Sequence, residues 1–137
     1  MSAVAMGLLK KGYSVSGSDL VKNNETKKLE KLGAIIFNYQ IRQNIEFVTS
    51  KFNNKLINFV VSTAIKPDNE ELMYCREKNL QVKHRSEILA QLMQSYTSLA
   101  VAGSHGKTST STFLSTLLEL CTHNSSSITG GIIPIYN

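Results

Sequence analysis

The sequence predicts an α/β protein: a Rossmann-like parallel sheet flanked by helices, followed by the beginning of a second α/β domain that opens on a glycine-containing loop. Two observations support this fold class. Strand-type and helix-type patterns alternate along nearly the whole chain, which is typical of parallel sheets covered on both faces. Hydrophobic residues make up 42% of the 137 residues, which is enough for a packed core.

Helices are predicted where apolar residues recur every three or four positions and a glycine or a polar cap marks an end. Val4, Leu8 and Leu9 share one face before Gly12, for example. The predicted helices span residues 3–11, 24–32, 44–50, about 67–78, 86–94 and 107–121.

Strands are predicted where short apolar or alternating runs are bounded by polar residues. They span residues 13–17, 34–37, 57–61, 81–83 and 98–102, and a further strand is expected to begin at 128–129. The chain opens with a helix, whereas a doubly wound domain normally opens with a strand. We therefore expect the first strand of the sheet to be missing.

A domain boundary is predicted near residues 94–97. Residues 1–95 then form the Rossmann-like domain, truncated at its N-terminus, and residues 96–137 form the beginning of the second domain, truncated at its C-terminus.

Composition excludes several classes of protein. The net charge of +5 comes from scattered lysines, so no nucleic-acid partner is expected; the excess is typical of a solvated surface or of attraction for anionic ligands. Cys75 and Cys121 are far apart and both are expected to be buried free thiols. Without a signal peptide or a long apolar span, we expect no membrane insertion and a cytoplasmic location.

The strongest motif is VAGSHGKTS at residues 101–109, between a predicted strand and a predicted helix. Its glycines allow backbone N–H groups to surround an anion, and the helix N-terminus adds a positive dipole end. Lys107 can reach a phosphate and the Thr108 hydroxyl can bind Mg²⁺. The usual spacing places glycine where Val101 stands, so the loop is a shortened variant. His105 either shapes the loop or contacts the ligand.

Three further segments lie where predicted strands end, at the sheet edge that binds ligands in open α/β folds. Asp19 follows the first predicted strand and is placed to hold a ribose, although it also fits a helix cap or turn. Ser62, Thr63 and Ala64 follow another strand, and a cap or loop role is equally open. Arg85 could pair with a phosphate, or form a surface salt bridge.

Five segments together resemble the UDP-N-acetylmuramate–L-alanine ligases (MurC) of the Mur ligase family. They read MSAVAMGLLKKGYSVSGSD, KLEKLGA, FVVSTAIKPDNEEL, VKHRSEILAQLM and VAGSHGKTSTSTFLSTLL, in the family's order and over nearly the whole chain. Met1 and Ser2 resemble the end of the family's Gly-Met-Ser loop, which would put the first strand and this loop before the chain.

The resemblance implies an ATP-dependent ligase of peptidoglycan precursor synthesis, with ATP and Mg²⁺ as cofactors. ATP would phosphorylate the carboxylate of UDP-N-acetylmuramate, and the amine of L-alanine would attack the acyl phosphate. The implied substrate-binding residues are Ser2, Asp19, Ser62, Thr63, Ala64 and Arg85. The implied ATP loop comprises Gly103, Ser104, His105, Gly106, Lys107, Thr108 and Ser109, with Lys107 and Thr108 as catalytic residues.

Two departures and two alternatives accompany this resemblance. Residues 38–40 read Asn-Tyr-Gln where the family often has Gly-His, and Ser104 stands where threonine is common. The alternatives are a murein-peptide recycling ligase that acts on the same UDP-sugar, and a non-catalytic nucleotide-sugar or ATP-binding module. The family's acidic Mg²⁺ motif and its acceptor domain do not occur in these residues, so we expect the chain alone to be inactive.

Overall fold

The computed structural model describes residues 1–52, 56–94, 96–122 and 125–128. The chain divides into two compact units, Met1–Tyr96 and Thr97–Asn137. The first unit contains the alternating helices and strands, and the described part of the second contains one long helix.

Every predicted helix is present, with boundaries close to those expected. The helices are α1 (Ser2–Lys10), α2 (Asn24–Lys31), α3 (Arg42–Lys51), α4 (Glu70–Glu77), α5 (Arg85–Met93) and α6 (Lys107–Thr122). The strands are β1 (Ser16–Ser18), β2 (Ile35–Phe37), β3 (Phe59–Val61) and β4 (Val82–His84). Strands β1, β2 and β3 are shorter than the segments predicted for them.

The four strands form two parallel pairs rather than one sheet. Strand β1 pairs with β2, with Ser16 opposite Ile35, and β3 pairs with β4, with Phe59 opposite Val82. The parallel pairing agrees with the predicted Rossmann-like sheet, whose first strand was expected to be missing. The two pairs are not bonded to each other among the described residues, because neighbouring strands bond only when they lie about 4.8 Å apart.

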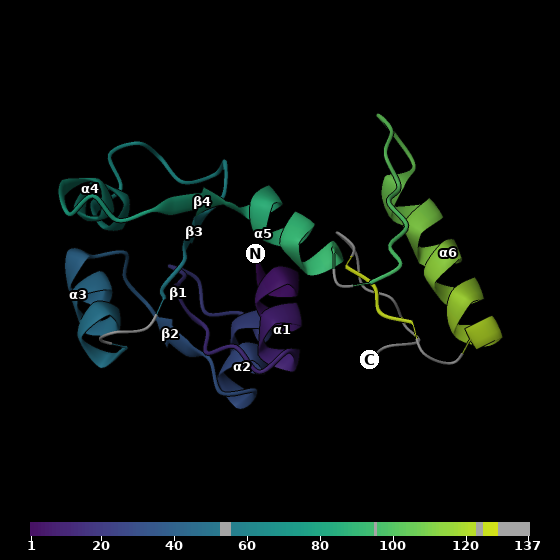
Figure 1. The fold of residues 1–137 in the computed structure, drawn as a ribbon, viewed down its shortest axis with the longest axis horizontal. Helices are drawn as coiled ribbons and strands as arrows, with labels where there is room; N and C mark the ends of the chain where they lie inside the picture. Colours follow the sequence, from purple (N-terminus) through teal and green to yellow (C-terminus); the bar gives the residue numbers. More distant parts are fainter. Residues whose placement is uncertain (53–55, 95, 123–124, 129–137) are drawn as a thin grey trace. The chain divides into compact units, whose positions relative to one another are not determined.

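Helices cover the strands of the first unit on two sides (Figure 1). Helices α3 and α4 lie on one side, and α1, α2 and α5 lie on the other. Val4 of α1 packs with Ile88 and Leu92 of α5, and Leu8 and Val60 pack against this cluster. Burial of these apolar side chains is the main force that holds α1 and α5 together.

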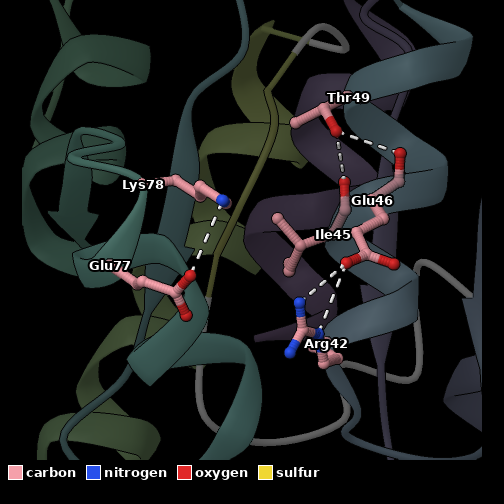
Figure 2. A network of polar contacts seen from close by, with 6 residues as sticks. All are labelled: Arg42, Ile45, Glu46, Thr49, Glu77 and Lys78. Atoms are coloured by element: carbon pink, nitrogen blue, oxygen red, sulfur yellow. Dashed lines mark hydrogen bonds and ion pairs between the residues drawn. The ribbon is translucent and has the colours of Figure 1, made fainter.

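Helix α3 shows how a polar outer face accompanies a buried inner face. Arg42 donates to a Glu46 carboxylate oxygen at 3.3 Å, and the Thr49 hydroxyl donates to the carbonyls of Ile45 and Glu46 (Figure 2). The exposed Arg42–Glu46 pair contributes only a few tenths of a kcal/mol. The opposite face buries Asn44 and Val48, so packing rather than surface pairing fixes the position of the helix.

Three predictions for the second unit need correction or fall outside the described residues. Residues 98–102 form no strand, because the described part of this unit contains no second strand with which they could bond. Cys121 is exposed, unlike Cys75, since its helix has little apolar cover among the described residues. Of the strand expected at 128–129, Ile128 is irregular and the rest lies outside the described residues.

Candidate functional site

Three of the predicted substrate-binding residues line one cavity in the first unit. The cavity has a volume of about 880 Å³, and Ser2, Asp19 and Ser62 all contribute to its wall. Ser2 is the first residue of α1, and the other two directly follow β1 and β3. The carboxyl ends of two strands and the N-terminus of a helix therefore meet at one cavity, as at ligand sites of open α/β folds.

Asp19 forms a turn as well as lining the cavity. Its Oδ1 accepts a hydrogen bond from the Val21 N–H at 3.0 Å, and its own N–H donates to the Phe37 carbonyl at 3.0 Å. The turn role that the sequence left open is thus present. It orients the carboxylate, since a side chain bonded to the backbone two residues on has little rotational freedom.

The Ser62–Ala64 segment is also a turn, closed by a 3.1 Å hydrogen bond from the Ile65 N–H to the Ser62 carbonyl. Ala64 lines a second, smaller cavity of about 310 Å³ together with Gln40 and Lys66. Thr63 is exposed and lines neither of these two cavities.

Arg85 is not brought to the site. It is the exposed first residue of α5 and lines neither of these two cavities. Within the described ranges it makes no ion pair either, so the surface salt bridge considered for it is also absent. The helix start is organised by its neighbour: the His84 N–H donates to Glu87 at 2.7 Å.

A polar cluster that the sequence analysis missed lies beside Asp19. The Glu71 carboxylate accepts hydrogen bonds from the Ser18 hydroxyl at 2.5 Å and from the Asn44 amide at 2.6 Å. The same Asn44 amide nitrogen donates to the Tyr39 carbonyl at 2.6 Å. Asn44 is buried, with 7% of its surface exposed, so these bonds satisfy a group that would be costly to leave unpaired.

A second contact joins the same segments. Asn69 caps α4 by accepting from the Leu72 N–H at 3.1 Å, and its amide donates to the Gln40 side chain at 2.8 Å. The helix therefore begins at Glu70, later than Pro67 suggested.

The loop before α6 contains two glycines with positive φ angles. Gly103 has φ 158° and Gly106 has φ 72°, values that residues with a side chain rarely adopt. The Lys107 ammonium donates to the carbonyls of Gly103 at 2.5 Å and Ser104 at 3.0 Å. Helix α6 begins at Lys107 itself.

The other predicted loop residues are open to solvent. All of the predicted ATP-loop side chains and glycines are exposed: Gly103, Ser104, His105, Gly106, Lys107, Thr108 and Ser109. Thr108 lies in the first turn of α6 and offers a hydroxyl oxygen, a type of ligand that Mg²⁺ accepts. No group of three or more His, Cys, Asp or Glu side chains in the described chain could hold a metal by itself.

Comparison with protein families decides the family. A model described as the Mur ligase family, catalytic domain, matches residues 1–97. The chain belongs to the Mur ligase family. This match covers the cavity and the polar cluster, whereas the loop at 103–109 lies beyond it.

Individual Mur ligases align over the whole chain, the loop included. The chain is 72% identical over all 137 residues to a UDP-N-acetylmuramate–L-alanine ligase of Prochlorococcus marinus subsp. pastoris, and covers 29% of that protein. It is 48% identical over 136 residues to the enzyme of the same name from P. marinus strain NATL1A, covering 27% of it. It is 42% identical over 137 residues to that of Dinoroseobacter shibae, covering 28%. The chain thus spans less than a third of these relatives.

The structure adds one observation on the membrane. None of the helices in the described residues is both long enough and apolar enough to cross a bilayer.

Proposed function

We propose that the chain is the UDP-sugar-binding and ATP-loop part of a ligase that joins L-alanine to UDP-N-acetylmuramate in peptidoglycan precursor synthesis. The observation that carries this proposal is the 72% identity, over all 137 residues, to a UDP-N-acetylmuramate–L-alanine ligase of Prochlorococcus marinus subsp. pastoris. The name also favours alanine over a murein peptide as the acceptor. Since both nucleotides are metabolites of the cytoplasm, we expect the reaction to take place there.

Asp19 and the Ser62–Ala64 turn hold the uridine end of the sugar nucleotide in this proposal. Asp19 and Ser62 support it by lining the same cavity. Ser2 stands at the N-terminus of α1, where backbone N–H groups favour the diphosphate. Arg85 is exposed and lines neither of the two cavities described above, so we give it a smaller part in substrate binding than the sequence suggested.

The loop at 103–109 binds the phosphates of ATP in this proposal. Lys107 neutralises phosphate charge, Thr108 is a ligand to Mg²⁺, and the loop N–H groups surround the anion. A metal bound there would supply charge stabilisation for the transferred phosphoryl group. Transfer of the γ-phosphoryl group to the muramate carboxylate would release ADP and form an acyl phosphate. Attack by the amine of L-alanine would then form the amide bond and release inorganic phosphate.

We expect no turnover by the 137 residues alone. Ligation needs a positioned acceptor and a complete set of charge-stabilising groups around the phosphate, and the chain covers 29% of its 72% identical relative. Formation of ADP and the alanyl product by the purified chain, above a no-protein control, would contradict this.

Calorimetry on the whole chain tests the binding roles. We expect binding of UDP-N-acetylmuramate and, separately, of Mg·ATP. Asp19→Asn should weaken binding of the sugar nucleotide about tenfold, which is the effect of losing one charge-assisted hydrogen bond, and leave the affinity for ATP unchanged.

Lys107→Met is the matched reciprocal variant. It should weaken ATP binding at least about tenfold, because it removes a charged donor to phosphate, and leave the affinity for the sugar nucleotide unchanged. A chain that binds ATP but no uridine nucleotide would instead be a different kind of phosphate-loop protein, and the proposal would fail.

A further inference from the structure

Glu71, at the start of α4, bonds to the end of β1 and to α3. One carboxylate oxygen accepts from Ser18, the last residue of β1, at 2.5 Å. The other accepts from Asn44 of α3 at 2.6 Å. These contacts join residues 53 and 27 positions apart in the chain.

The Glu71 carboxylate connects α4 to β1, and no strand hydrogen bonds of the described chain connect β1 to β3. Strands β1 and β3 belong to different pairs in the described chain, so no strand hydrogen bonds set the distance between their ends. Glu71 follows β3 through the Ser62–Ala64 turn and α4, while Ser18 immediately precedes Asp19. Charge-assisted bonds to a half-buried carboxylate are among the stronger and more directional contacts available for this purpose.

We infer that Glu71 is a positioning residue for the nucleotide end of the UDP-sugar: by holding Ser18 and Asn44 it sets Asp19 and the Ser62–Ala64 turn at the separation that the uridine needs. This inference rests on the proposed function. Glu71 itself acts through Ser18 and Asn44. The neighbouring bond from Asn69 to Gln40 at 2.8 Å also ties the start of α4 to the segment before α3.

Three variants of the full chain test the role. Glu71→Ala removes both acceptors and should weaken UDP-N-acetylmuramate about tenfold at a temperature where circular dichroism shows the chain folded. Glu71→Gln should bind within about twofold of the unmodified chain, because its amide keeps an acceptor for Asn44 and offers a donor to the Ser18 oxygen. Ser18→Ala removes one contact only and should cost roughly two- to tenfold.

Glu77→Gln is the matched control on the same helix. Glu77 is exposed and pairs only loosely with Lys78, at 3.6 Å (Figure 2), so neither nucleotide should be affected. Binding of Mg·ATP should be unchanged in all four variants, because the phosphate loop lies in the other unit. A selective loss of the uridine ligand, rescued by the amide, distinguishes positioning from a purely structural role, which would lower the melting midpoint and leave affinity intact.

The outcomes separate the two claims. If the unmodified chain fails to bind UDP-N-acetylmuramate, the proposed function fails and this inference with it. If the unmodified chain binds and folded Glu71→Ala binds equally well, only the positioning role is overturned. Should Glu71→Ala not fold, equal binding by Ser18→Ala and the unmodified chain has the same meaning.

Discussion

At the scale of single residues, the most informative side chains are polar ones that lie on buried helix faces. Asn44 lies one turn before buried Val48, and Glu71 lies one turn before buried Cys75. This spacing was visible in the sequence and could have marked both residues as inward-facing. Their partners could not be predicted, because Ser18 and Asn44 reach Glu71 only after distant segments have packed.

The two cysteines should differ sharply in reactivity. Burial, with a smaller contribution from the charge of Glu71, raises the pKa of the Cys75 thiol above its ordinary 9.0, and only the thiolate is nucleophilic. At mildly alkaline pH we expect iodoacetamide to modify exposed Cys121 at least about tenfold faster than Cys75. Mass spectrometry of timed samples measures both rates, and equal rates would contradict the burial of Cys75.

The raised pKa of the Cys75 thiol also makes the stability of the fold depend on pH. A raised pKa favours the neutral thiol in the folded state, so its contribution is complete below 9.0 and is lost as pH rises through the folded-state pKa. We expect the free energy of unfolding to fall with pH in this alkaline range, measured by urea titration. Cys75→Ser should show a smaller fall; identical slopes would refute the assignment.

At the scale of elements, local sequence predicted the helices because their periodicity and caps lie within a few residues. Strands depend on partners elsewhere in the chain. The run at 98–102 has an apolar strand pattern, yet Leu99 is 63% exposed and no described strand of its unit pairs with it. The cavity followed the same rule: Asp19 and Ser62 could be placed at its wall from their positions after strands, whereas the partners of Glu71 could not be predicted.

Helix α2 offers a direct measurement of a cap. The Asn23 side chain accepts from the N–H groups of Glu25 and Thr26, and the Thr26 hydroxyl accepts from the Asn23 N–H. Asn23→Ala should lower the free energy of unfolding by about 1 kcal/mol. Adjacent Asn24→Ala, inside the first turn, should change it by less than about 0.5 kcal/mol. Similar denaturation midpoints for the two variants would argue against the cap.

At the scale of the whole molecule, the first unit has an open interior between its two strand pairs. Residues of both β1 and β3 line the 880 Å³ cavity, and in the described chain each strand pairs on one edge only. An added strand placed between β1 and β3 could bond to the free edge of each.

This arrangement predicts that a strand-forming extension will stabilise the unit. We expect about five β-branched residues and a glycine turn, fused before Met1, to raise the melting midpoint by roughly 4–8 °C for each kcal/mol gained. The same extension with a central proline is the control, since proline cannot donate to a ladder. Calorimetric melts that coincide for the two fusions would show that no added strand bonds to the free edges of β1 and β3.

The bonds from the Lys107 ammonium to the Gly103 and Ser104 carbonyls have a consequence for anion capture. A free lysine side chain must be frozen from many rotamers when it grips a ligand, which costs up to about 2 kcal/mol of conformational entropy. Here that ordering has largely occurred beforehand. If the loop binds ATP as proposed, an arriving phosphate would exchange acceptors around a cation that is already in place, and its net gain would be the difference between an anionic oxygen and two peptide oxygens.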